Sequence, residues 1–389
     1  MGLFGTTNFE SDELKRFNSL KPEEREIVFY SEDKNSAFIY ESLINELVDI
    51  HRLNVCYVSS NKEDPILTQK NNKIKTFYIG EGTARTKFFL TLKTNIIIMT
   101  MPDLETLNIK RSKVHPVHYV YLFHSMVSTH LAYRKEAFDN FDTIFCVGNY
   151  QIEEIRSAEK IYELKPKKLI KYGYSHLDNL IERFSKYRIN SSKKIHVLIA
   201  PSWGKDGLFN TLSRDIIKIL LETEYKVTLR LHPMTLKKSK NEIKNIQEEF
   251  LSNTNFVLET DVTNFETIFS SDVIISDWSG IALEYAFSQK KPVVYINVSK
   301  KINNKDYEKN PHVPIEESIR KEIGVLVEPS EIELLPKKIK GLIEQNNIFH
   351  EKIEKIRDKT IFNIGKSVEE GGKEIINLLN QIRHERAQD

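Results

Sequence analysis

Two polar segments of this chain, each directly after a short apolar run, have residue types suited to phosphate chemistry. His232 follows the apolar run 227–231, and the segment from Ser276 to Gly280 follows the run 273–275. Such runs are typical of buried parallel strands, and open α/β sheets bind their ligands beside the carboxyl ends of these strands. The second segment leads into an amphipathic pattern that predicts a helix, whose free N–H groups would favour a diphosphate. Together the segments indicate an enzyme that acts on a nucleotide-activated donor.

His232 is the first candidate for contact with the donor phosphates. Its side chain could hydrogen-bond the phosphates and stabilise charge as a nucleoside monophosphate leaves. The alternative is an exposed loop histidine, because the residue before a proline favours extended backbone. Arg230 and the segment from Ser276 to Gly280 are expected close by, which favours the functional interpretation.

Residues around the predicted helix start could bind the rest of the donor. Ser276, Ser279 and Gly280 would supply hydroxyl and backbone donors to the diphosphate, and Ser279 could also cap the helix. Asp277 belongs to the same donor-binding turn. Glu284, one helical turn beyond Gly280, could accept hydrogen bonds from ribose hydroxyls, and a solvated helix carboxylate is an equal alternative.

Ser202, Trp203 and Lys205 lie in a loop after a further apolar run, 195–200. We expect them to contact phosphate or the transferred group. Gly204 and Gly207 make the loop supple, which suits closure on a ligand. A plain turn explains the same residues nearly as well.

These segments need a scaffold of parallel strands with helices between them. Apolar runs alternate with helical patterns along the chain, and this alternation predicts parallel sheets. Strand candidates in the first half are 27–30, 55–58, 76–79, 95–99, 117–123 and 143–147. Strand candidates in the second half are 195–200, 227–231, 256–258, 273–276, 293–296 and 325–327.

The length of 389 residues exceeds one ordinary core, and a charged stretch at 181–194 separates the two strand series as a linker. We predict an N-terminal Rossmann-like domain over residues 1–185, which would hold the acceptor. A C-terminal Rossmann-like domain over 195–345 would hold the nucleotide donor, and C-terminal helices would follow over 346–389. Two such domains that face a central cleft, with C-terminal helices that close back, describe the GT-B fold.

Composition argues against several functions. Lys and Arg number 57 against 55 Asp and Glu, so the net charge of +2 gives no basic field for nucleic acid. No apolar run approaches the ~20 residues needed to cross a bilayer, and we see no secretion signal at the N-terminus. Cys56 and Cys146 fall in predicted buried strands, which is typical of reduced thiols in a cytoplasmic protein.

Neither a metal ion nor another cofactor is predicted. His115, His118, His124 and His130 are close in sequence, but their spacing matches no zinc motif. Strand alternation also sends His115 and His118 to opposite faces. No Asp-x-Asp motif calls for a divalent ion at the diphosphate.

A basic cluster, Lys337, Lys338 and Lys340, lies beside the apolar face of a predicted helix in the tail. Such a cluster could contact anionic lipid, which would place the protein at the inner face of the plasma membrane. A solvated helix face is the simpler interpretation.

Five motifs follow one another between about residues 95 and 300. They are Phe123-His124-Ser125, Gly173-Tyr174-Ser175-His176-Leu177-Asp178, Ala200-Pro201-Ser202-Trp203, Arg230-Leu231-His232-Pro233 and Ser276-Asp277-Trp278-Ser279-Gly280, the last with Glu284-Tyr285-Ala286 and Lys291-Pro292-Val293-Val294-Tyr295 after it. In this order they resemble the signatures of the CDP-glycerol glycerophosphotransferase family, which includes the teichoic-acid primases and polymerases.

The chain departs from the family pattern at three places. Ser125 stands where the family has glycine, Ser175 and His176 replace a Pro-Arg pair, and Glu284 stands where the polymerases more often carry aspartate. These departures leave the superfamily intact and leave open which donor and acceptor are used. Surface-polysaccharide transferases of capsule or lipopolysaccharide pathways would share the same frame.

The resemblance implies a metal-independent transferase that moves glycerol phosphate from CDP-glycerol onto a surface-polysaccharide or lipid-linked acceptor. It also implies that His124 accepts the proton of the acceptor hydroxyl, while CMP departs beside His232 and the helix start. The alternative for His124 is a structural histidine, hydrogen-bonded at the end of a strand.

Three other functions fit the same frame. A GT-B glycosyltransferase with a nucleotide sugar, such as a UDP-linked one, would serve capsule, lipopolysaccharide or cell-wall glycan synthesis and differs mainly in the atom attacked. A nucleotide-sugar 2-epimerase would need further carboxylates in the cleft, and the sequence offers no convincing set. A non-catalytic partner in an assembly complex would bind a nucleotide or glycan without turnover.

Overall fold

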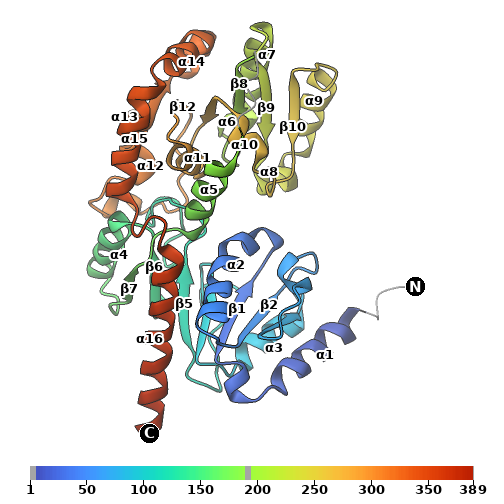
Figure 1. Cartoon of the computed structure of the whole chain (residues 1–389), viewed down its shortest axis with the longest axis vertical. Helices are drawn as coiled ribbons and strands as arrows, with labels where there is room; N and C mark the ends of the chain where they lie inside the picture. The colour runs from blue at the N-terminus through green and yellow to red at the C-terminus, as the bar shows by residue number, and fades with distance from the viewer. Residues whose placement is uncertain (1–5, 189–193, 389) are drawn as a thin grey trace.

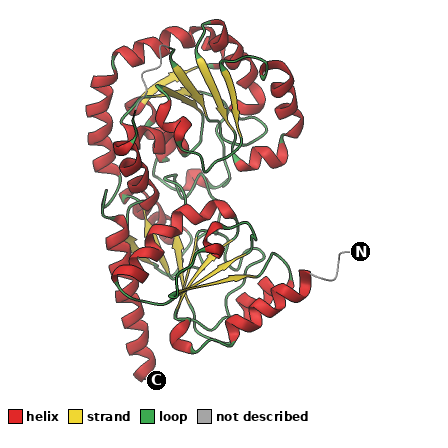
Figure 2. Ribbon diagram, turned by 45° about the vertical axis from the view of Figure 1, so that its right-hand side comes forward, coloured by secondary structure: helices red, strands yellow, loops and turns green. Residues whose placement is uncertain are grey.

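The computed structural model describes residues 6–188 and 194–388, which form two parallel β-sheets with helices packed around them (Figures 1 and 2). The strands of the first sheet are β1 (Ile27–Ser31), β2 (Val55–Ser59), β3 (Ile74–Tyr78), β4 (Ile96–Met99), β5 (His118–Leu122), β6 (Thr143–Cys146) and β7 (Lys168–Lys171). The strands of the second sheet are β8 (His196–Ile199), β9 (Lys226–Arg230), β10 (Phe256–Glu259), β11 (Val273–Ser276), β12 (Val293–Ile296) and β13 (Gly324–Val327).

Both sheets have the same doubly wound topology. The first has the strand order β3-β2-β1-β4-β5-β6-β7 and the second the order β10-β9-β8-β11-β12-β13. All described pairings are parallel. The winding direction reverses between β1 and β4 and again between β8 and β11, which opens a crevice at the carboxyl ends of these strands. The predicted pair of Rossmann-like domains is therefore confirmed.

Burial explains why the apolar runs became strands. Every residue of β1, β2, β4, β8, β11 and β12 is buried, as expected for central parallel strands covered on both faces. The edge strand β7 differs, because Lys168 and Lys171 are exposed at its two ends. For this reason, the apolar runs in the sequence did not predict β7.

Helices connect and cover the strands. They are α1 (Thr6–Asn18), α2 (Ala37–Asn45), α3 (Thr83–Thr91), α4 (Asn149–Ile161), α5 (Ser175–Lys186), α6 (Leu208–Thr211), α7 (Ser213–Glu222), α8 (Pro233–Lys238), α9 (Lys240–Phe250), α10 (Glu266–Ser270), α11 (Ile281–Gln289), α12 (Ile315–Ser318), α13 (Arg320–Ile323), α14 (Leu335–Glu344), α15 (Asn346–Thr360) and α16 (Ser367–Gln388). Short helical turns are η1 (Pro22–Glu24), η2 (Lys34–Ser36), η3 (Glu46–Ile50), η4 (Pro65–Thr68), η5 (Tyr307–Lys309) and η6 (Pro329–Leu334).

The predicted linker at 181–194 was wrong at its start, because α5 continues to Lys186. Residues 189–193, also part of that prediction, lie outside the described residues. The end of α5 is helical because it packs on the second domain: the rings of Phe184 and Tyr187 lie 5.8 and 5.6 Å from that of Phe269.

One apolar core joins the two domains. It includes the buried residues of the first sheet and continues through α5 and α11 to one face of the second sheet. A separate cluster covers the other face of the second sheet. The two domains are thus held in contact by buried apolar surface.

The last helix returns to the N-terminal domain, where α16 runs beside the first sheet (Figure 1). It packs against α2, η3 and α5. A β-carbon on Gly371 would lie 2.4 Å from the Tyr172 ring, so glycine allows this close approach. Arg383, near the end of α16, pairs with Glu26 before β1.

Cys56 in β2 and Cys146 in β6 are buried free thiols, as predicted. Within the described ranges, the structure contains no helix that combines the length and apolarity needed to span a bilayer.

Candidate active site

His124 follows Phe123 at the end of β5, and its imidazole contacts the residue that follows the neighbouring strand β4. Its Nδ1 is 3.2 Å from the carbonyl oxygen of Thr100, just after β4. Because a carbonyl only accepts, Nδ1 carries the proton, and Nε2 of the neutral ring is free to accept one. Although the side chain reaches solvent, the surrounding protein displaces water and lowers the pKa of His124; Thr100 and Asp33 oppose this effect. His124 is therefore a neutral base at pH 7.

His232 lies at the start of α8 and has the opposite tautomer. Its Nδ1 accepts a hydrogen bond from the backbone N–H of Met234, at 3.0 Å. The proton of the neutral ring is therefore on Nε2, which can donate to a ligand. Burial lowers the pKa of His232 to about 4, and the charges of Lys301 and His124 contribute to this shift.

The two histidines come from different domains and complement each other. A charge on His124 acts on His232 across the domain boundary, so the two rings lie within electrostatic range. Nε2 of His124 can accept a proton, and Nε2 of His232 can donate a hydrogen bond. A general base opposite an anion-stabilising donor suits group transfer to a hydroxyl.

The start of α11 lies against the N-terminal domain. Gly280 precedes the helix and no side chain caps its first turn, so the predicted cap by Ser279 is wrong. The first-turn N–H groups consequently remain available for an anion. A β-carbon on Gly280 would lie 2.2 Å from Oγ of Ser125, so glycine lets the residue after His124 approach the helix start.

Glu284 in α11 is connected to His124 through Tyr174. The Tyr174 hydroxyl lies 2.8 Å from the His124 carbonyl oxygen and 3.2 Å from a carboxyl oxygen of Glu284. Burial raises the pKa of Glu284 to about 7, and the Tyr174 hydrogen bond opposes the shift. The contact of Glu284 with a ribose stays a prediction. In this network, Tyr174 alone separates the Glu284 carboxyl group from the backbone of the candidate base.

Four other residues predicted to bind the donor form hydrogen bonds within the protein, three of them between the ends of β8 and β11. The Asp277 carboxylate accepts hydrogen bonds from Ser202 N at 2.6 Å, Ser202 Oγ at 3.0 Å and Leu208 N at 3.0 Å. Ser276 Oγ donates to the carbonyl oxygen of Ala200 at 2.7 Å. These bonds hold the loop that contains Ser202 and Lys205 against the end of β11.

Arg230, the fourth, is buried and its guanidinium is surrounded by protein acceptors. It lies 2.5 Å from a carboxylate oxygen of Glu259 and 2.6 Å from the carbonyl oxygens of Val262 and Asn264. These contacts neutralise the guanidinium charge and occupy its hydrogen-bond donors in the absence of the donor substrate. They also fix the segment after β10.

A basic aromatic cluster beside His232 contains Trp203, which the sequence predicts near the phosphate or the transferred group, and two lysines that the residue pattern did not indicate. The Trp203 and His232 ring centroids are 6.3 Å apart. The ammonium groups of Lys238 and Lys301 lie 4.4 and 4.1 Å from the Trp203 ring centroid. Burial lowers the pKa of Lys301 to about 8. Lys301 follows β12, so the rule that ligands bind beyond strand ends could have found it.

A groove of about 950 Å³ lies next to this cluster, between the loop after β8 and the helices α8 and α9. Lys205 lines it and is exposed. The volume of the groove is at the upper end of the range of small-molecule sites. The groove therefore has room for a large ligand beside the candidate catalytic residues.

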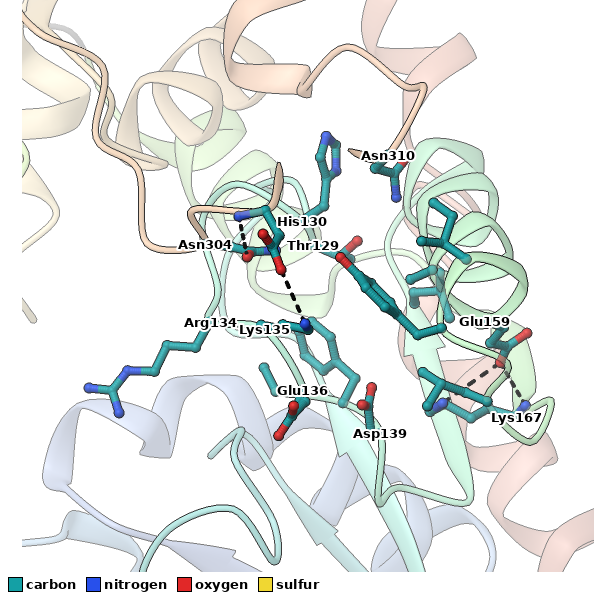
Figure 3. A pocket seen from close by; sticks show the side chains of 18 residues that line it. Thr129, His130, Arg134, Lys135, Glu136, Asp139, Glu159, Lys167, Asn304 and Asn310 are labelled. Atoms are coloured by element: carbon teal, nitrogen blue, oxygen red, sulfur yellow. Dashed lines mark hydrogen bonds and ion pairs between the residues drawn. The ribbon is translucent and has the colours of Figure 1, made fainter. Parts of the chain in front are cut away.

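A smaller cavity of about 50 Å³ lies in the N-terminal domain and is bounded by the segment that contains Asn304 (Figure 3). Two of its lining residues, Lys135 and Asp306, form an ion pair at 3.1 Å. The cavity can hold a few water molecules but not a nucleotide.

The other histidines near His124 have structural partners. His118 contacts the Thr143 hydroxyl at 2.8 Å, and His130 contacts the carbonyl oxygen of His312 at 3.0 Å. Across residues 6–188 and 194–388, the structure has no group of three or more His, Cys, Asp or Glu residues placed to hold a metal ion.

Two parallel-sheet Rossmann-like domains, C-terminal helices that return to the first domain, and polar residues at facing strand ends define a GT-B-like enzyme. The chain belongs to the CDP-glycerol:poly(glycerophosphate) glycerophosphotransferase family, whose model matches residues 13–361. The family resemblance of the five motifs is thereby confirmed. Among curated proteins, none matches this chain.

Solved structures with the same fold include the wall teichoic acid polymerase TagF after a soak with CDPG, at 15% identity and a TM-score of 0.57 over 97% of this chain and 94% of that chain. UDP-GlcNAc 2-epimerase from Neisseria meningitidis, bound to UDP-GlcNAc, has 14% identity and a TM-score of 0.59 over 91% and 99%. Anabaena HepE with UDP and glucose has 13% identity and a TM-score of 0.55 over 92% and 99%. These similarities confirm the GT-B fold.

Proposed function

We propose that this enzyme transfers glycerol phosphate from CDP-glycerol to a hydroxyl group of a surface-polymer or lipid-linked acceptor, as in the synthesis of teichoic-acid-type polymers. The family supplies the donor class. The opposite tautomers of His124 and His232 carry the proposal, because one ring can take a proton while the other donates to an anion.

The proposed reaction is an in-line displacement at phosphorus. Nε2 of His124 takes the proton of the acceptor hydroxyl as its oxygen attacks the β-phosphorus. The new oxygen–phosphorus bond forms, the bond from the β-phosphorus to the bridging oxygen breaks, and CMP leaves with that electron pair. The Nε2–H of His232 and the N–H groups at the start of α11 stabilise the charge on the leaving phosphate. Such a transfer depends on positioning and charge stabilisation.

The roles of the other predicted donor residues follow from their contacts. Ser279 and Gly280 would present hydroxyl and backbone groups to the diphosphate, and Lys205 would reach it from the loop after β8. Ser202, Ser276, Asp277 and Arg230 would act indirectly, because their hydrogen bonds hold the loops that carry these groups.

The first experiment combines donor binding with turnover. Saturation with CDP-glycerol at ~100 times its Kd should stabilise the wild type by about 2.7 kcal/mol, and His232→Ala should lose most of this gain. His124→Ala should keep the stabilisation and lose CMP release in the presence of a poly(glycerol phosphate) acceptor. His350→Ala, at an exposed position on α15, is the matched control and should behave as wild type.

The same assay separates the main alternative. Stabilisation by a UDP-linked sugar, with no response to CDP-glycerol, would contradict the proposal and indicate a glycosyltransferase. Binding of CDP-glycerol without turnover on any acceptor would indicate a non-catalytic partner.

A further inference from the structure

The groove beside Trp203 is more basic than the donor requires. Lys205, Lys237, Lys238 and Lys240 line it, against one carboxylate, Glu242, among the described lining residues. The diphosphate of a CDP-linked donor has a single negative charge on each phosphorus. One donor molecule therefore leaves most of this positive charge unbalanced, so the groove suits a ligand with more anionic groups.

Two lysines beside Trp203 place positive charge at the end of the groove nearest His232. Both Lys238 and Lys301 place their ammonium groups over its indole ring, at 4.4 and 4.1 Å from the centroid. In the described part of the chain, neither ammonium lies within 4.0 Å of a carboxylate oxygen, and the Asp277 carboxylate that attracts Lys301 already accepts three hydrogen bonds from Ser202 and Leu208. Two like charges on one ring repel each other, and a bound anion would relieve this repulsion.

The position of the groove relates it to the acceptor. It begins at Trp203, 6.3 Å from the His232 ring, and continues along α8 to the start of α9. A chain that extends along it would have one end beside the reacting groups. The family's polymer, poly(glycerophosphate), repeats a phosphodiester in every unit, which matches a row of lysines. The indole ring of Trp203 offers an apolar surface to the glycerol carbons between phosphates.

We propose that this groove, which lies in the C-terminal domain and not in the N-terminal domain where the sequence predicts the acceptor, binds the poly(glycerol phosphate) portion of the acceptor, with successive phosphodiesters beside Lys301, Lys238 and Lys240. The proposal rests on the proposed transferase function, because it assigns the acceptor of the same site. The groove would hold the growing end near His124 and His232 and make long acceptors better substrates than short ones.

The test compares acceptors of one and of about ten glycerol phosphate units. In wild type, the KM of the longer acceptor should be lower. The double variant Lys238→Ala, Lys240→Ala should reduce the preference for the long over the short acceptor at least tenfold, and the dependence of its KM on salt should weaken, because fewer counterions are exchanged. Lys352→Ala with Lys355→Ala, at exposed positions on α15, removes the same charge elsewhere and should leave the preference intact. An equal rise in KM for both acceptors, or a rise in the KM of CDP-glycerol instead, would overturn the proposal.

A binding measurement separates this proposal from the catalytic one. Titration of the ten-unit oligomer into the protein without CDP-glycerol, followed by tryptophan fluorescence, needs no turnover. Binding that Lys238→Ala, Lys240→Ala weakens at least tenfold supports the groove even if no transfer occurs. Unchanged binding overturns the groove assignment even if transfer is normal. Vesicles of phosphatidylglycerol form the third arm: lysine-dependent binding of vesicles without binding of the oligomer would assign the groove to a membrane surface and overturn the proposal.

Discussion

At the scale of single residues, one backbone contact sets the chemistry of each candidate catalytic histidine. A carbonyl acceptor at Nδ1 makes His124 a base at Nε2, and an N–H donor at Nδ1 makes His232 a hydrogen-bond donor at Nε2. The sequence could predict both positions from the strand ends, but not the tautomers. The tautomers depend on Thr100 and on the helical turn at Met234, and neither contact leaves a signal in the residue pattern.

The pH dependence of the transfer should report His124. Its lowered pKa keeps the ring unprotonated at neutral pH, so kcat/KM should fall only as the pH drops through a value below 6.5, the usual pKa of histidine. His124→Ala should lower kcat by ~10²–10⁴-fold and remove this acid limb. The check is a pH profile of CMP release for both proteins. An acid limb that persists unchanged in the variant would assign the base to another residue.

At the scale of elements, hydrogen bonds between neighbouring strand ends hold the site together. The Asp277 carboxylate after β11 accepts hydrogen bonds from Ser202 in the loop after β8 and from Leu208 at the start of α6, and Arg320 donates to the Asp277 carbonyl. The central strands were predictable because parallel strands covered on both faces read as unbroken apolar runs. The sequence did not predict the edge strand β7, because its two ends are polar. It also did not predict the ion pair of Arg230 with Glu259, because these residues are far apart in sequence.

Removal of the Asp277 carboxylate should loosen the loop after β8. Asp277→Ala leaves the buried N–H groups of Ser202 and Leu208 without their acceptor, which should cost about 1–3 kcal/mol of unfolding free energy for each such group. Denaturant unfolding measures the loss, and CDP-glycerol affinity should fall with it. Asp206→Ala, at an exposed position in the same loop, is the control. Full stability with lost affinity would instead indicate that Asp277 contacts the donor directly.

At the scale of the whole molecule, buried titratable groups make stability depend on pH. Burial lowers the pKa of His196, at the start of β8, to about 4. Its two ring nitrogens lie beside the hydroxyls of Thr228 and Ser270. The unfolded chain binds a proton here near pH 6.5 and the folded chain does not, so this contribution is complete above pH 6.5 and is lost toward pH 4. Glu284 and Glu316, with pKa values raised to about 7, act in the opposite direction.

The contribution of His196 can be isolated by difference. Between pH 7 and pH 5, the wild type should lose about 2 kcal/mol more unfolding free energy than His196→Gln, at roughly 1.4 kcal/mol for each unit between pH 6.5 and pH 5. Denaturant unfolding of both proteins at the two pH values measures this difference, in which the opposing carboxyl groups cancel. Parallel losses in the two proteins would contradict the buried neutral state of His196.

The return of α16 to the first domain has a consequence for biosynthesis. The surface of α2 and η3 that this helix covers belongs to the first fifty residues that a ribosome makes, while α16 (Ser367–Gln388) is made after both sheets. During translation the N-terminal domain must therefore remain uncovered until the second domain has emerged. A nascent chain released before that point would expose this apolar face to chaperones and to other nascent chains.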